Sequence, residues 1–435
     1  MYPWPVKIFT RCDMPRLRYA AGIIFTTVLG VPYELVTDKR KLGNCPVINY
    51  SDEEVKGAFR ITPAFLMEEN GIKPHNLSVT LWKGLPVIFE TDSRSDIPFD
   101  IFSAVFYMVS RYEEYLDFDP DIHGRFPAHQ SLAYRNGFLD RPVVNLWIKE
   151  FTKLLVVRFP GLVFRKNSFR KMVTFDVDEP FKYLGKGVIR NLGGLFSDMG
   201  KKEPDPMERL RTVSGKLKDP WDNFDYLIIK AAESGSEIRF FFPAGDRSRF
   251  DRWPAWNNHD YRGLITSLAS KIPSGLHPSY YSTDNPELLA EEKKRLDSLI
   301  PEGISSSRYH YLRLRFPSSY SSLLTAGITE DYSMGFPDEP GFRAGISVPY
   351  DFYDLKAEKI TNLRIYPFQV MDATLMHYKM MNPEDAEILI MRLIDETKNA
   401  GGLFQTVWHN NNLAEGERSN RWQGVFENIL NYPGQ

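Results

Sequence analysis

The chain contains little cysteine, no long apolar run and almost no net charge, and each shortage excludes a class of protein. Cys12 and Cys45 are its two cysteines in 435 residues. They are too few for a disulfide framework and lack the spacing of a zinc site, so we expect a reducing, cytoplasmic location. The longest apolar run, 20–28, contains two threonines and is too short to span a bilayer. No basic region followed by an apolar core opens the sequence, so no secretory signal is predicted.

The charge balance argues against polyanionic partners. There are 54 basic and 56 acidic residues, and the net charge of −2 gives no electrostatic reason to expect nucleic acid or an anionic membrane. A neutral or small ligand fits better. The length exceeds what one hydrophobic core usually serves, and 43% of the residues are hydrophobic. We therefore expect two domains, a small α/β domain at 1–165 and a second domain at 166–435.

Two irregular segments are expected to be loops. The stretch 117–142 is rich in Pro, Gly, Asp and Asn, and it follows a predicted helix over 98–116. We interpret its His123 and His129 as surface or loop-anchoring histidines, because no acid or cysteine stands at ligand spacing on a predictable element. The charged stretch 196–223 is predicted to be an insertion that lies over the mouth of the second domain.

From about residue 166 the sequence repeats a rhythm of strand, polar residues and helix. Such a rhythm is typical of parallel βα units. A helix is predicted at 383–398, with glycines just beyond it. Strands are predicted at 172–177, 238–242, 272–277, 304–308 and 403–409.

The stretch MVTFDVDEP at 172–180 reads as a strand that ends in two acids. Because side chains of a strand alternate, Asp176 and Asp178 share one face at its C-terminal end. Like charges so close repel, and a metal ion, a shared proton or a nearby arginine usually compensates them. The alternative is a strand end with two solvated acids.

Ionisable residues recur at the ends of successive predicted strands. Two acids with one or two histidines can hold a divalent metal, an arginine can keep a carboxylate ionised, and an aspartate can orient a histidine that transfers a proton. This mixture predicts metal-assisted hydrolysis of an amide or ester, although Arg343 alone could brace a loop and Asp372 alone could cap a helix. The residues concerned are Asp176, Asp178, His277, His310, Arg343, Asp372 and His409.

The words TFDVD, LHPSYYS, FRAGISVPY, MDATL and VWHN, in this order over about 166–435, resemble the motifs of the polysaccharide deacetylases. These are the NodB-like enzymes of carbohydrate esterase family 4. RYEEYL and HGRFP, together with LHPSY, DYSMGF, GFRAG and WHN, resemble a bacterial subgroup with an uncharacterised N-terminal domain. The resemblance implies a distorted (β/α) TIM-like barrel preceded by a small α/β domain.

The resemblance also implies a reaction and a set of roles. The enzyme would remove acetyl groups from an N- or O-acetylated saccharide with a bound divalent metal, zinc being the expected ion. Asp176 would be the general base, kept ionised by Arg343, and Asp178 a metal ligand. His277 would be a second ligand. The general acid would be His409, oriented by Asp372.

One position departs from the family pattern. The family's second motif has a further histidine four residues after the first, and here that position is Tyr281. We hypothesise that His310 completes the metal site, because its strand should neighbour the strand of His277. Alternatively, Ser282, water or substrate fills the coordination.

Two other functions compete with the deacetylase. A barrel without metal competence would bind glycans or a protein partner. A glycoside hydrolase that uses Asp176 and Asp178 is less favoured, because residues two apart on a strand are separated by only ~6.5–7 Å along it.

Overall fold

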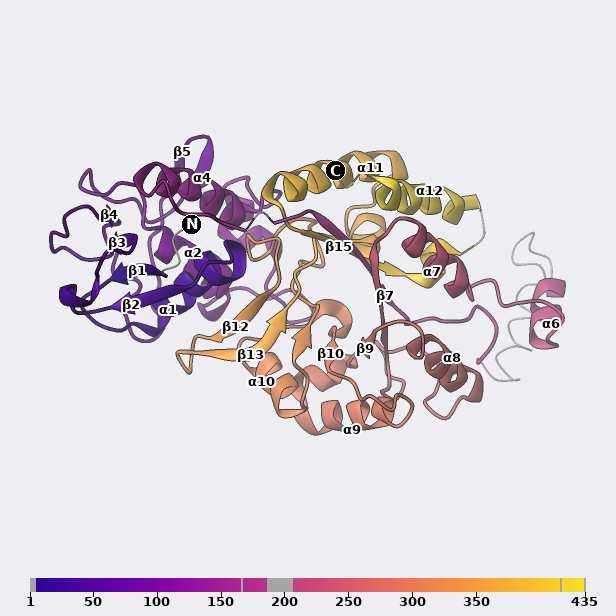
Figure 1. Cartoon of the computed structure of the whole chain (residues 1–435). Coiled ribbons are helices and arrows are strands. Elements are labelled where there is room, and N and C mark those ends of the chain that lie inside the picture. The colour runs from indigo at the N-terminus through magenta and orange to yellow at the C-terminus, as the bar shows by residue number, and fades with distance from the viewer. Residues whose placement is uncertain (1–4, 166, 186–205, 415–416, 434–435) are drawn as a thin grey trace.

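The computed structural model describes residues 5–165, 167–185, 206–414 and 417–433. Residues 196–205 of the predicted insertion lie outside the described residues, and α6 (Pro206–Val213) follows them. Figure 1 shows α6 set apart from the other helices. No helix in the described ranges is long and apolar enough to cross a membrane.

The N-terminal part, residues 5–165, is built on a small parallel sheet with the strand order β2-β1-β3-β4. A two-stranded antiparallel hairpin, β5-β6, follows it in the chain. The strands are β1 (Val6–Phe9), β2 (Tyr33–Val36), β3 (Val47–Asn49), β4 (Phe59–Arg60), β5 (Thr80–Trp82) and β6 (Leu85–Val87). The helices and helical turns are α1 (Pro15–Ala21), η1 (Gly22–Val28), η2 (Lys39–Lys41), α2 (Ile101–Val109), η3 (Tyr112–Tyr115), η4 (Ala128–Gln130), α3 (Leu132–Arg135) and α4 (Val143–Arg158).

Helix α2 is shorter than the predicted helix over 98–116. It begins after Asp100, whose carboxylate accepts the backbone N–H groups of Phe102 and Ser103. It ends before Arg111, because this residue adopts a left-handed conformation with φ +56° that no α-helix continues. All residues of α2 are buried, so the helix forms the centre of the N-terminal core.

The remainder of the chain forms a nine-stranded sheet in the order β12-β13-β11-β10-β9-β8-β7-β15-β14. All neighbouring pairs are parallel except β12 and β13. The strands are β7 (Arg170–Asp176), β8 (Glu237–Phe242), β9 (Ser274–Leu276), β10 (Ser306–Ser307), β11 (Glu330–Asp331), β12 (Tyr350–Asp354), β13 (Lys359–Ile365), β14 (Val370–Met371) and β15 (Leu403–His409).

Helices connect the parallel strands and lie around the outside of the sheet (Figure 1). They are α7 (Phe224–Glu233), α8 (His259–Ala269), α9 (Pro286–Asp297), α10 (Ser318–Thr325), α11 (Pro383–Ala400) and α12 (Glu417–Asn431). Short helical turns follow four strand ends: η5 (Tyr280–Asp284), η6 (His310–Leu312), η7 (Thr374–Tyr378) and η8 (Asn410–Leu413).

The parallel βα rhythm predicted from residue 166 onward is confirmed, but the sheet is not a closed barrel. The predicted strands at 172–177, 238–242 and 403–409 match β7, β8 and β15 to within two residues. Within the described ranges, no pairing joins the end strands β12 and β14. One of these two end strands, β14, has only two residues. The architecture is therefore a mixed α/β fold with an open, mainly parallel sheet.

The N-terminal part packs directly against the large sheet. The ring centroids of Tyr19 and Tyr353 are 4.9 Å apart, and those of Phe106 and Tyr353 are 5.2 Å apart. The hydroxyl of Tyr19 also donates to the backbone oxygen of Asp351 at 2.8 Å. One buried apolar cluster includes residues of both parts. The domain boundary at 165/166 stays a prediction.

Candidate active site

The C-terminal ends of the parallel strands surround a cavity of about 270 Å³. β7 and β15 are paired over their whole length, with Asp176 beside His409. β8, β9 and β10 continue the sheet from β7, so the residues that follow them reach the same edge. Five of the residues singled out from the sequence line the cavity: Asp176, Asp178, His277, His310 and His409.

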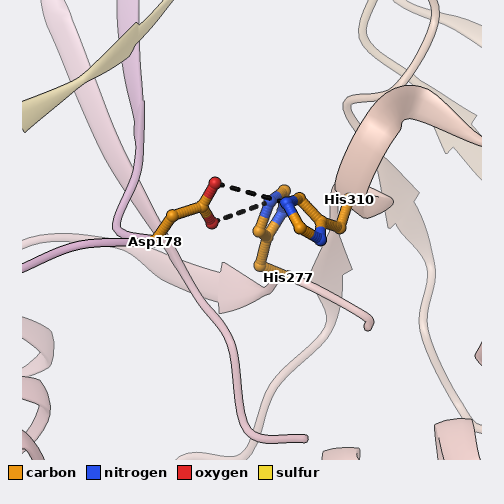
Figure 2. A group of neighbouring side chains, drawn as sticks. All are labelled: Asp178, His277 and His310. Atoms are coloured by element: carbon orange, nitrogen blue, oxygen red, sulfur yellow. Dashed lines mark ion pairs between the residues drawn. The ribbon is translucent and has the colours of Figure 1, made fainter. Parts of the chain in front are cut away.

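Asp178, His277 and His310 lie together as a possible metal-binding group. Nε2 of His277 is 3.3 Å from Oδ1 of Asp178, and Nε2 of His310 is 3.4 Å from Oδ2. Figure 2 shows both imidazole rings turned toward the carboxylate. The three ligand atoms lie within 4.8 Å of one another. This is the juxtaposition expected if His310 takes the place of the histidine that Tyr281 replaces.

The surroundings of the three residues fit a divalent ion. Oδ1 of Asp178 and Nε2 of His277 are buried, and neither has a hydrogen-bond partner in the part of the chain that the structure describes. Leaving such atoms unpaired is costly, and a metal ion would satisfy both. Two imidazoles and a carboxylate are ligands typical of catalytic zinc, which usually keeps about three protein ligands.

The second nitrogen of each imidazole is fixed by the protein. Nδ1 of His277 donates to the backbone oxygen of Arg308 at 2.6 Å. Nδ1 of His310 lies 2.9 Å from Oδ1 of Asp251, a carboxylate that is 1% exposed. These bonds leave Nε2 of both rings for a ligand, which is how metal-binding histidines are usually oriented.

The pKa values of Asp178 and His310 are shifted by their charged neighbours. Burial alone would raise the pKa of Asp178, but the neighbouring His310 and His277 hold it well below its usual range. Burial likewise lowers the pKa of His310, and the carboxylates of Asp178 and Asp251 overcome this effect and raise it to about 9. The group is thus a set of mutually stabilised charges around one point.

Asp176 is held by Arg308 and not by Arg343, which corrects the expected pairing. Nη1 of Arg308 donates to Oδ1 of Asp176 at 2.8 Å, and Nη2 donates to the hydroxyl of Thr174 at 2.7 Å. Arg308 is fully buried, and its Nε donates to the backbone oxygen of Tyr332. Because it follows β10 directly, its side chain reaches back across the sheet to the end of β7.

Arg343 lies in a different buried cluster. Its Nε and Nη2 donate to the two carboxylate oxygens of Glu114 at 2.9 and 2.5 Å, and its Nη1 donates to the backbone oxygen of Gly335. Glu114 belongs to the RYEEYL stretch of the N-terminal part. The loop that contains Arg343 is therefore tied to the N-terminal part, and no hydrogen bond or ion pair joins this guanidinium to Asp176 in the described ranges.

Asp372 and His409 form the pair expected from the sequence. Oδ1 of Asp372 is 2.7 Å from Nδ1 of His409, and Oδ2 accepts the backbone N–H of His409 at 2.7 Å. Nε2 of His409 faces the cavity, 3.7 Å from Oδ2 of Asp178. Burial lowers the pKa of His409, but Asp372, with a smaller contribution from Asp178, raises it to about 10. A proton is therefore held at the edge of the cavity.

A strained turn follows His310. Tyr311 and Leu312 have φ of +59° and +53°, in the left-handed region that costs non-glycine residues about 1–2 kcal/mol each. Both residues line the cavity. Tyr281 lies outside the cavity lining and is 49% exposed, and the hydroxyl of Ser282 donates to the backbone oxygen of Ser279. Ser282, the alternative protein ligand to His310, is thus bonded elsewhere.

Sequence reasoning missed Arg308, Asp251 and Arg125. Arg308 stands two residues before His310 at a predicted strand end, and this position could have identified it. Asp251 lies in an irregular loop after β8, where no periodicity marks it. Arg125 comes from the N-terminal loop, in which sequence reasoning weighed only the histidines, and it lines the cavity.

Comparisons with known proteins give partial matches. A family model described as "Family of unknown function (DUF7033)" matches residues 6–160. A search of curated proteins found no match. Among solved structures, a Mycobacterium smegmatis protein described as a polysaccharide deacetylase is similar, with a TM-score of 0.39, 12% identity, and coverage of 62% of this chain and 86% of that one.

Two further structures are similar at a lower level. One is a mutant of a CE4 family pseudoenzyme, with a TM-score of 0.30, 8% identity, and coverage of 61% of this chain and 63% of that one. The other is IcaB from Ammonifex degensii, with a TM-score of 0.22, 14% identity, and coverage of 39% and 84%. At these identities and TM-scores the similarities do not assign an activity to the chain.

Proposed function

We propose that this protein is a metal-dependent hydrolase that removes an acetyl group from an N- or O-acetylated saccharide. The observation that supports this most strongly is the convergence of two groups on one cavity. Asp178, His277 and His310 form a ligand set on one side, and the Asp372–His409 pair faces it. The order of the sequence motifs, which resembles that of the polysaccharide deacetylases, agrees with this arrangement.

Asp178, His277 and His310 would hold a divalent ion, with zinc expected. Bound there, the ion would polarise the acetyl carbonyl and make a water molecule more acidic. The protein supplies the orientation, because the backbone oxygen of Arg308 and the carboxylate of Asp251 fix the two imidazoles.

Asp176 would accept the proton of the attacking water as general base. Arg308 binds its Oδ1 and so fixes the carboxylate at the cavity wall, which leaves Oδ2 to take the proton. This proposal gives Arg308 the role that the sequence assigned to Arg343. The pairing of Arg343 with Glu114 supports a structural role for that arginine.

His409 would give a proton to the leaving nitrogen or oxygen as general acid. Asp372 fixes its Nδ1, so Nε2 is the atom that donates. The size of the cavity suits one small substituent rather than a buried oligosaccharide, since pockets that enclose drug-sized ligands measure about 300–1,000 Å³. Leu312, Pro337 and Met371 line it and offer an apolar surface for a methyl group.

The test measures acetate release from a panel of N- and O-acetylated saccharides, with metal content determined on the same sample. Chelation should abolish release, and added divalent metal should restore it. Full activity after exhaustive metal removal would contradict the mechanism. A stoichiometric metal without acetate release from any acetylated saccharide would contradict the substrate class. Absence of bound metal together with saccharide binding would favour the alternative of a glycan-binding protein.

A further inference from the structure

A loop of the N-terminal part reaches the cavity and is rigid by itself. Oδ1 of Asp121 accepts the backbone N–H groups of His123 and Arg125 at 2.9 Å each, and Oδ2 accepts Nε of Arg125 at 2.7 Å. The backbone N–H of Asp121 in turn donates to the backbone oxygen of Arg125. Arg125 is 4% exposed, although it belongs to a loop. The loop, residues 121–125, thus presents a fixed guanidinium to the cavity.

Arg125 joins two segments of the cavity wall. Its Nη1 donates to the backbone oxygen of Tyr311 at 2.7 Å, and its Nη2 donates to the hydroxyl of Tyr378 at 3.1 Å. Tyr311 lies in η6 beyond β10, whereas Tyr378 ends η7 beyond β14. One side chain from the N-terminal part therefore connects two turns of the large sheet that are far apart in the sequence.

A second contact holds the same turn two residues further along. Nε of Arg313 donates to the backbone oxygen of His123 at 3.0 Å, and its Nη1 donates to the backbone oxygen of Tyr280 at 2.5 Å. Nδ1 of His123 lies 3.1 Å from the hydroxyl of Tyr280, so the loop is fixed to η5 as well. Loop 121–125 consequently contacts the turn at Tyr311 and at Arg313.

The turn that loop 121–125 contacts is the strained turn that begins with His310. Left-handed non-glycine residues persist only where the surrounding structure over-determines them. Tyr311 and Leu312 are two such residues in succession, directly after a residue whose ring faces Asp178 at 3.4 Å. If the turn relaxed, Nε2 of His310 would leave its place in the ligand set.

We infer that Arg125 is a positioning residue of the metal site, and that loop 121–125 completes this site by clamping the turn His310–Arg313. The N-terminal part thereby contributes to the geometry of the active site without supplying a ligand. The inference rests on the proposed function in one respect, namely that His310 binds a metal. The clamp itself can be measured without any ion.

The first experiment measures amide hydrogen exchange of the metal-free full-length chain. Arg125→Met keeps the bulk of the side chain and removes the guanidinium, while Arg125→Lys keeps one donor. Arg94→Met is the matched control, because Arg94 also binds a nearby aspartate, Asp92, but is exposed on another N-terminal loop. We expect peptides covering 309–313 to exchange at least about tenfold faster in Arg125→Met, at an intermediate rate in Arg125→Lys, and normally in the control. Unchanged exchange at 309–313 in Arg125→Met would overturn the clamp.

The second experiment titrates the same proteins with Co²⁺ and records the visible absorption of the complex. Loss of a positioning contact typically weakens metal binding about 10–100-fold, so Arg125→Met should bind more weakly and show an altered spectrum. The Arg94→Met control should match the wild type. Wild-type affinity and spectrum in Arg125→Met would show that the clamp does not position His310.

Two safeguards keep the outcomes distinct. Thermal unfolding of each metal-free variant establishes that it folds, and Asp121→Asn replaces Arg125→Met if the latter does not. Asp121→Asn weakens the anchor of Arg125 while leaving its side chain in place. A wild-type chain that binds no Co²⁺ would overturn the proposed function, and the exchange result would still decide whether the clamp exists.

Discussion

Two buried clusters of charged side chains differ in whether the protein satisfies them. In the Glu114 cluster, Glu114 accepts from both Arg111 and Arg343, and Glu113 accepts from Arg111. In the cavity cluster, Oδ1 of Asp178 and Nε2 of His277 lie 3.3 Å apart, but neither has a hydrogen-bond partner among the described residues. The Glu114 cluster consists of Arg111, Glu113, Glu114 and Arg343, and the cavity cluster of Asp176, Asp178, His277, His310 and His409.

The difference supports a structural role for the Glu114 cluster and a metal-binding role, as proposed above, for the cavity cluster. Burial raises the pKa of Glu114, and Arg343 and Arg111 more than compensate and hold it below its usual range. The buried guanidinium groups of Arg343 and Arg111 thus keep Glu114 ionised. The charge of Asp178 is stabilised by the neighbouring imidazoles of His310 and His277. A metal ion can take the place of the imidazole protons, because metal binding requires the ligands to lose them. The protein's own charges satisfy the first cluster, whereas the second contains two buried atoms without a hydrogen bond that the proposed metal ion would satisfy.

Substitutions of the two acids of the cavity cluster should have the largest effect. Asp176→Asn should lose about 10²–10⁴-fold in turnover and keep its metal, because general-base catalysis contributes roughly that factor. Asp178→Asn should lose the metal itself. Acetate release and metal content, measured on both variants, check this prediction. Turnover at the wild-type rate in Asp176→Asn would show that another group is the base.

The Glu114 cluster should show the opposite pattern. Glu114→Gln leaves Arg111 and Arg343 with an uncompensated buried charge, and breaking a buried pair in this way costs about 3–5 kcal/mol of stability. Metal content and turnover of the folded fraction should stay near wild type. Glu150→Gln, which breaks more exposed pairs with Lys83 and Lys153, is the control and should cost no more than about 1 kcal/mol.

Denaturant unfolding measures both variants. A stable Glu114→Gln protein without activity would contradict the assignment and place this cluster in the site.

The sequence predicted the ends of the strands better than the contacts between them. Strand periodicity is local, so β7, β8 and β15 were found within two residues. The positions of Asp176 at the end of β7, of Asp178 just beyond it and of His409 at the end of β15 followed from this. β14 has two residues and leaves almost no periodic signal, whereas β10 lies within the strand predicted at 304–308. The lack of pairing between β12 and β14 among the described residues, which leaves the expected distorted barrel open, depends on contacts that no local pattern encodes.

The pairing of the arginines could not be predicted from local pattern. Which of Arg308 and Arg343 meets Asp176 depends on the sheet order β7-β8-β9-β10. A single sequence does not contain this order. The resemblance to known motifs selected Arg343, which the fold instead places beside Glu114. The inferred role of Arg125 was hidden for the same reason, because its contacts with Tyr311 and Tyr378 are 186 and 253 residues away in the chain.

His409→Ala should separate two classes of substrate. An amide has a poor leaving group that needs a proton, so we expect a loss of about 10²-fold or more on an N-acetyl sugar. An activated aryl acetate leaves without a proton and should lose much less. His377→Ala is the matched control, because His377 also lines the cavity but is not bonded to Asp372. Steady-state rates on both substrates test this, and an equal loss on both would indicate a structural role for His409.

The smallest expected effect is on the pH dependence of metal binding, which should change in a variant of the cavity cluster's surroundings but not in a variant of the Glu114 cluster. The pKa of His310 is raised to about 9, since Asp178 and Asp251 outweigh the effect of burial. Below that pH the imidazole holds a proton that the ion must displace, so the apparent affinity should fall about tenfold for each pH unit and level off above pH 9.

Asp251→Asn removes one of the two carboxylates, which should lower the pH at which the curve levels off. The same variant should also weaken binding about 10–100-fold on the plateau, because the ring loses its orientation. Glu114→Gln should follow the wild-type curve, since its charge lies in the other cluster. Competition titrations with a chelator at several pH values measure all three curves, and an affinity independent of pH would mean that His310 is not a ligand.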